Sequence, residues 1–279
     1  MTRKKAVRIV AAIFLLAVAL PALAGGPAKA ISNNPEAQKL IDETWALEIP
    51  DHSAEIFKQC VSLMEQAAQL DPDNHAILSD LSRYYWSYGD NLPKQTMEQQ
   101  KFLEDIYAKG LNAANKSLKV KETPAGHYWY TVNKAASLEF RSILVQVAAL
   151  PTLYRHYRYV ADNDPDYFYG ATGRLYTEIL SRVPKKLVEI VGQTHLSEAK
   201  RQINRAIRKE PRYLSNYIYK ARFMYVYFGK QDEALHLLDT ALKMEPNDLP
   251  DAATDNRVSQ REARQLWKKI TGKEYPQRQ

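Results

Sequence analysis

The chain has 279 residues and a formal net charge of +7, from 39 Lys and Arg against 32 Asp and Glu side chains. Four of the basic residues lie within the first eight positions, so the rest of the chain is near +3 and does not predict a nucleic-acid partner. Cys60 is the only cysteine, which excludes an intramolecular disulfide. The length suffices for one large helical domain or one repeat array.

The first 24 residues are typical of a secretory signal peptide. "MTRKKAVR" supplies a basic start, and "IVAAIFLLAVAL" is apolar but too short to span a bilayer comfortably. Ala22 and Ala24 place small residues at the −3 and −1 positions of a cleavage site. We therefore expect cleavage after Ala24 and a periplasmic protein, and the alternative is a retained N-terminal membrane anchor. No cysteine directly follows the apolar stretch, so no lipoprotein anchor is expected there.

A helical repeat is the clearest pattern in the remaining chain. Asn34 before Pro35 is typical of a helix start, with an N-cap and a first-turn proline. "CVSLMEQAAQLDP" (60–72), "SEAKRQINRAIRKEP" (197–211) and "QDEALHLLDTALKMEP" (231–246) share small residues seven apart, a larger apolar residue between them and a closing proline. In the last two segments the shared positions are offset by 35 residues: Ala199, Ile203, Ala206 and Pro211, then Ala234, Leu238, Ala241 and Pro246. This pattern indicates the second helix of a tetratricopeptide repeat, whose period is about 34 residues.

Small residues on one helix face let a partner helix approach closely, and the proline ends the helix. Cys60 falls at one of these small positions, so we expect it in the core rather than in a redox site.

Residues 123–184 break the repeat and gather aromatic residues. Thr123 and Pro124 predict a helix start, which leads into "HYWYTVN". Further on, "DPDYFYGATGR" adds aromatic residues, two glycines and an arginine. We interpret the two segments as the border of a ligand-binding cleft, with Tyr128, Trp129, Asn133, Tyr167, Tyr169, Gly170 and Arg174 as its residues. Arg174 would pair with a carboxylate, and the glycines would let the backbone approach a ligand or the facing helix. The alternative is that the aromatic residues form the core of an irregular solenoid.

The C-terminal part predicts a closing helix. Ser259 and Glu262 have the spacing of a capping box, and Gly272 would end the helix. The predicted fold is all-α, a right-handed superhelix of tetratricopeptide-like helix pairs with an irregular central segment and a C-terminal capping helix. A single domain is expected over 25–279, with repeat-like units at about 53–90, 96–147, 196–229 and 231–270 and an irregular insert over 150–195.

Motifs of catalytic or cofactor sites are missing from the sequence. It contains no phosphate-binding loop, no H-E-x-x-H and no nucleophile elbow, and its six histidines never pair at metal-ligand spacing on one helix. "GATGR" follows no predicted strand, which argues against a phosphate loop. The sequence therefore predicts no enzyme, no cofactor and no metal.

The motifs resemble the T component of tripartite ATP-independent periplasmic (TRAP) transporters, the TatT-like family. The shared features are the degenerate helical repeats, the Tyr-Trp pair in "HYWYTVN", the segment "DPDYFYGATGR", and "LSRVP" before the repeat at 197–211. The resemblance implies a cleft through an apolar region of each subunit, flanked by Tyr128, Trp129, Tyr167, Tyr169, Gly170 and Arg174. It also implies a homotrimer as one form of assembly.

By this resemblance the expected function is that of a periplasmic ligand-binding accessory protein of solute uptake. It would work beside the periplasmic solute-binding protein of a TRAP transporter and take a small organic or hydrophobic ligand. The alternative is an envelope tetratricopeptide-repeat scaffold that binds a peptide or protein partner on its concave face.

Overall fold

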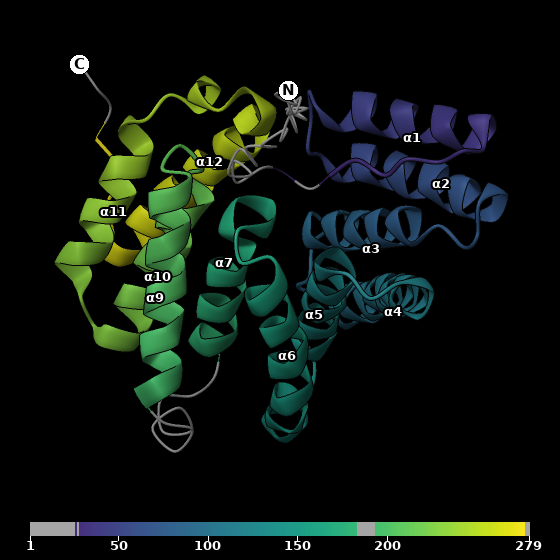
Figure 1. The fold of residues 1–279 in the computed structure, drawn as a ribbon. Coiled ribbons are helices and arrows are strands. Elements are labelled where there is room, and N and C mark those ends of the chain that lie inside the picture. The colour runs from purple at the N-terminus through teal and green to yellow at the C-terminus, as the bar shows by residue number, and fades with distance from the viewer. Residues whose placement is uncertain (1–25, 27, 183–192, 277–279) are drawn as a thin grey trace, which may run out of the picture.

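The computed structural model describes residue 26, residues 28–182 and residues 193–276 (Figure 1). All regular structure within these ranges is helical, which confirms the all-α fold of helical repeats. The signal segment and its cleavage site lie outside the described residues. None of the described helices is both long and apolar enough to cross a lipid bilayer.

Consecutive helices pack against one another along the chain. Figure 1 shows α1–α4 on one side, α9–α11 on the other, and α5–α7 between them. The helices are α1 (Pro35–Glu48), α2 (Ala54–Leu70), α3 (His75–Asp90), α4 (Met97–Val120), α5 (Pro124–Leu138), α6 (Ile143–Asn163), α7 (Tyr167–Arg182), α9 (Gln193–Lys209), α10 (Ser215–Phe228), α11 (Gln231–Lys243) and α12 (Ala253–Thr271). Two short 3-10 turns, Pro246–Asp248 and Pro250–Ala252, lead into α12.

The repeat positions lie in the core, as the sequence predicts. The small and apolar residues of the pattern are at most 2% exposed: Cys60, Met64 and Ala67 in α2, Ala199, Ile203 and Ala206 in α9, and Ala234, Leu238 and Ala241 in α11. The Cys60 thiol lies 3.7 Å from the carbonyl oxygen of Thr44, and burial raises its pKa to about 12. Cys60 is therefore a core residue that stays protonated.

The first two predicted helix starts are confirmed, and the third is wrong. The side chain of Asn34 accepts from the first backbone N–H groups of α1, and that of Thr123 accepts from the backbone of Gly126 in α5. Ser259 and Glu262, by contrast, lie inside α12, which begins at Ala253. The helix can start earlier because the preceding 3-10 turns already direct the chain into it. At its other end Gly272 takes the left-handed conformation (φ 73°), as predicted.

Two glycines bring α7 and α9 together. A Cβ atom on Gly173 would lie 2.8 Å from the backbone of Ile203, and one on Gly170 would lie 2.4 Å from the Cβ of Ala206. Of the two roles proposed for these glycines, the structure therefore shows close approach to a facing helix. Gly170 also has a positive φ of 80°, which glycine adopts without strain.

Candidate functional site

The inner side of the curved chain holds a cavity of about 620 Å³ between the N-terminal helices and α12. This volume falls in the range of small-molecule sites, about 300 to 1,000 Å³. Aromatic side chains from six helices and one loop make up much of the wall: Trp45, Phe57, Trp86, Tyr128, Trp129, Phe168, Tyr169, Tyr213 and Tyr219. The cavity is thus formed by segments that are far apart in the sequence.

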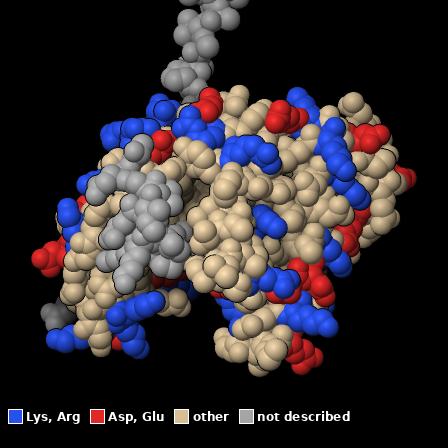
Figure 2. Space-filling view, turned by 90° about the horizontal axis from the view of Figure 1, so that it is seen from below, with Lys and Arg blue, Asp and Glu red and all other residues tan. Residues whose placement is uncertain are grey.

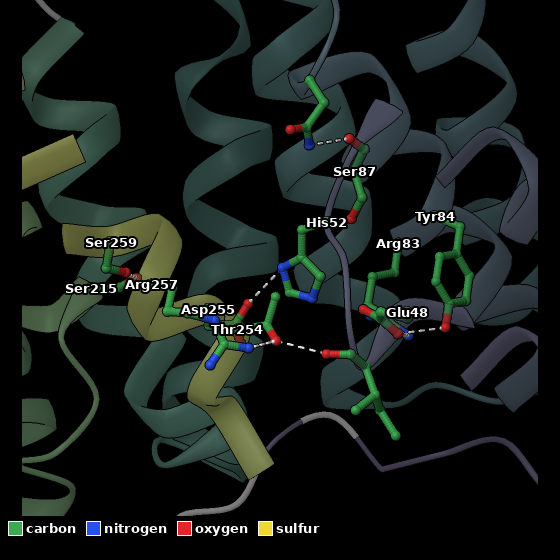
Figure 3. A network of polar contacts seen from close by, with 12 residues as sticks. Glu48, His52, Arg83, Tyr84, Ser87, Ser215, Thr254, Asp255, Arg257 and Ser259 are labelled. Atoms are coloured by element: carbon green, nitrogen blue, oxygen red, sulfur yellow. Dashed lines mark hydrogen bonds and ion pairs between the residues drawn. The ribbon is translucent and has the colours of Figure 1, made fainter. Parts of the chain in front are cut away.

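Contacts between the two ends of the chain close one side of this cavity (Figure 3). Thr254 Oγ1 donates to the carbonyl oxygen of Ile49 at 2.7 Å, and His52 Nδ1 lies 3.4 Å from Asp255 Oδ1. Ile49 and His52 follow α1, whereas Thr254 and Asp255 begin α12. The first helix pair therefore touches the last helix, and the inner face of the solenoid is not an open groove at this point.

Arg83 in the cavity wall is neutralised by its neighbours. Its guanidinium pairs with both carboxylate oxygens of Glu48, one contact measuring 2.9 Å, and Tyr84 donates to Glu48 Oε2 at 2.7 Å. Burial opposes ionisation of Glu48, but the charge and hydrogen bonds of Arg83 hold the pKa of this carboxyl below its ordinary value. Asp80, also beside Arg83, has its pKa raised to about 6 by burial.

Arg174 uses its guanidinium to hold a strained turn. It donates to the carbonyl oxygens of Phe168 (2.6 Å) and Tyr169 (3.1 Å) and to Asn216 Oδ1 (2.7 Å). Phe168 and Tyr169 have positive φ angles of 46° and 54°, a conformation that costs energy in non-glycine residues. Arg174 lines the cavity, but its contacts stabilise this turn, so a structural role replaces the carboxylate partner that the sequence suggested.

The two predicted segments meet at the cavity. Tyr128, Trp129, Tyr169 and Arg174 line it, and Tyr167 lies behind them, with its hydroxyl accepting from Trp129 Nε1 at 3.0 Å. The rings of Tyr128 and Tyr167 are 5.4 Å apart and meet edge to face. That these residues bind a ligand stays a prediction.

Asn133 and Gly170 are placed elsewhere than predicted. Asn133 is fully buried among α3, α4 and α5, where its Nδ2 donates at 3.0 Å to the carbonyl oxygens of Ser82 and Trp129. A Cβ on Gly110 would lie only 2.2 Å from Asn133 Oδ1, so the side chain fills the space left by that glycine. Gly170 faces α9 rather than the cavity. Both residues therefore serve helix packing.

The polar face of α12 was not anticipated from the sequence. Asp255, Val258, Ser259 and Glu262 all line the cavity, and their spacing of three and four residues puts them on one side of the helix. Burial raises the pKa of Glu262, and the charges of Asp90 and Glu178 add to this effect although Arg222 opposes it. The sequence does contain polar residues at this spacing, but Ser259 and Glu262 were interpreted as a capping box.

A second cavity of about 300 Å³ adjoins the first. The two share the lining residues Trp86, Asp90, Tyr128, Arg174, Tyr219 and Glu262. From there the second cavity extends between α5, α6 and α7, where its wall is largely aliphatic. We call the shared residues the junction. The joined cavities therefore have charged and aromatic groups at the junction and an apolar extension beyond it.

A histidine pair joins α5 to α6 outside these cavities. His127 Nδ1 and His156 Nδ1 are 2.9 Å apart, and His127 Nε2 lies 3.0 Å from Glu122 Oε1. The two histidines come from different helices, so spacing along one helix could not reveal them. Across residues 26, 28–182 and 193–276, no group of three potential metal-binding side chains is found.

One protein-family model matches most of the chain. The model of the family "Regulator of microtubule dynamics protein 1-3" matches residues 47–271, a range that includes the lining of the second cavity and all of the first except Gly26, Lys29 and Trp45. No individually curated protein matches the chain. The matching family differs from the TRAP transporter component whose motifs the sequence resembles, and that resemblance stays a prediction. The extent of the match establishes that this chain belongs to the regulator of microtubule dynamics protein 1-3 family.

Proposed function

We propose that this protein binds a small organic ligand in the cavity between its N-terminal helices and α12, and that it performs no chemistry of its own. The observation that carries the proposal is that the Thr254–Ile49 hydrogen bond and the His52–Asp255 contact close one side of the cavity. A concave face built to hold a folded protein or a long peptide would be expected to stay open along its length.

Three further features support a binding role. The cavity has the volume of a small-molecule site, aromatic residues dominate its wall, and a few polar groups converge on it. From the motif resemblance we place this activity in an exported accessory protein that works beside a periplasmic solute-binding protein.

The proposal can be tested by filling the cavity. Val258 lines it on the inner face of α12, so Val258→Trp should displace a bound molecule. Arg264→Trp adds the same side chain at an exposed position of the same helix and serves as the control. Native mass spectrometry of the purified protein should detect a co-purifying small molecule in the parent and in Arg264→Trp, and its loss in Val258→Trp.

Two results would contradict the proposal. One is the absence of any retained small molecule in the parent protein together with binding of a peptide or protein partner, which would favour the scaffold. The other is a retained molecule that Val258→Trp leaves in place, which would put the binding site elsewhere.

A further inference from the structure

We infer that the ligand carries a positively charged nitrogen, which lies at Glu262, and an aliphatic chain, which lies between α5, α6 and α7. This inference rests on the proposed function, because it names the chemical class of the molecule that the cavity would hold.

Carboxylates exceed basic side chains around the joined cavities. Their walls contain seven Asp and Glu side chains and four Lys and Arg side chains. On the outer surface, in contrast, Figure 2 shows basic and acidic side chains interspersed over the face seen from below. Low-dielectric walls strengthen the field of the excess charge inside a cavity, so the interior favours a cation over an anion.

The basic side chains near the junction are already engaged. Arg222 pairs with Glu178 at 2.8 Å, and the donors of Arg174 go to backbone carbonyls and Asn216. Glu262 differs, since it makes no hydrogen bond or ion pair with any residue that the structure describes. A carboxylate that faces a cavity without a partner is stabilised when a cation comes within contact distance.

Glu262 also has aromatic neighbours that suit a cation. Trp86, Tyr128 and Tyr219 line the junction together with Glu262. Aromatic rings attract cations through their quadrupole, and the effect is larger in a desolvated site. The carboxylate and the rings therefore favour the same kind of group, an alkylammonium.

The second cavity accounts for the aliphatic chain. Beyond the junction its wall includes Val132, Leu150, Leu175 and Ile179, which come from α5, α6 and α7. Methylene groups buried there leave water for an apolar surrounding, which favours binding. A molecule with a cationic end and a short aliphatic chain would thus satisfy both parts of the joined cavities.

Isothermal titration calorimetry of the full chain with octyltrimethylammonium, 1-octanol and octanoate tests the inference, because the three probes share a chain and differ in charge. We expect the ammonium compound to bind at least about ten-fold more tightly than 1-octanol, and octanoate to bind most weakly. Glu262→Gln should reduce the affinity for the ammonium compound to the level of 1-octanol without changing the affinity for 1-octanol. Glu43→Gln, at an exposed position of α1, should change neither affinity.

Glu262→Gln should fold, because no hydrogen bond or close ion pair of Glu262 with a described residue is lost, and Arg222, which attracts this carboxylate, keeps its ion pair with Glu178. Asp90→Asn provides a second variant and should weaken ammonium binding less, since Asp90 is exposed. Equal or tighter binding of octanoate or 1-octanol would overturn the inference while leaving a ligand cavity in place. If none of the three probes binds but another molecule co-purifies, the inference is wrong and the proposed function stands; if nothing co-purifies either, both fail.

Discussion

The hydroxyl of Thr254 donates a hydrogen bond of 2.7 Å to the carbonyl oxygen of Ile49, which precedes it by 205 residues. The bond joins the start of α12 to the end of the first helix, and the neighbouring His52–Asp255 contact reinforces it. A contact of this kind links the two ends of a curved array of helix pairs and bounds the inner cavity on one side. Removing this hydrogen bond tests whether the contact between the two ends of the chain stabilises the protein.

Replacing Thr254 with Val should remove the hydrogen bond and keep the shape of the side chain. We expect the free energy of unfolding to fall by about 0.5–1.5 kcal/mol, with faster amide exchange around residues 49–53. Thr240→Val is the control, because the Thr240 hydroxyl donates to the carbonyl oxygen of His236 in its own exposed helix turn. Equal exchange around residues 49–53 in both variants would show that the Thr254 contact does not hold the two ends together.

Arg174→Ala should destabilise the protein by about 2–4 kcal/mol, because it removes several charge-assisted hydrogen bonds that hold the left-handed turn at Phe168 and Tyr169. Arg174→Lys should not restore stability, since an ammonium cannot replace the planar fork of donors. Arg264→Ala, at an exposed position of α12, provides the control in urea denaturation. A midpoint for Arg174→Ala equal to that of the parent would contradict the structural role.

Ala206→Leu should overpack the contact between α9 and α7. Ala206 is 2% exposed and faces Gly170 so closely that even one added carbon on the glycine would clash. The expected loss of stability is about 1–3 kcal/mol, and Ala241→Leu in α11 should behave in the same way. Ala108→Leu on the exposed face of α4 should be nearly neutral. Unchanged denaturation midpoints for both buried variants would mean that these alanines are not at close contacts.

The histidine pair predicts a loss of stability in mild acid. Burial lowers the pKa of His156 to about 4, and the charges of His127 and Arg155 act in the same direction. Burial also lowers the pKa of His127, although Glu122 opposes this. At these two histidines the unfolded chain therefore binds more protons than the native protein below about pH 6.5, and their contribution to stability falls as the pH drops from there toward 4.

This prediction can be checked by measuring urea denaturation at several pH values between 7.5 and 4.5. His156→Phe keeps a ring beside Tyr130 but cannot titrate, so its stability should fall less steeply over this range. His236→Gln, which alters an exposed histidine of α11, should follow the parent protein. Parallel curves for the parent and His156→Phe would show that the pair does not cause the acid sensitivity.

Local patterns predicted the helices and their buried faces. The spacing of Ala199, Ile203 and Ala206 identified the buried side of α9, because residues three and four apart share one face of a helix. Asn34 and Thr123 marked helix starts correctly, since capping depends on only the next few backbone N–H groups. The resemblance of the central motifs to a transporter component rests on the same local information and stays a prediction.

The sequence by itself thus determined that this protein is a chain of amphipathic helices with small residues where helices meet. Only the tertiary structure decided that α12 returns to Ile49, that Asn133 and Arg174 hold the framework, and that Glu262 faces a cavity. The physical reason is the distance along the chain over which each interaction acts. Helix periodicity and capping act within a few residues, whereas the position of the last helix depends on the packing angles accumulated over all the helices before it.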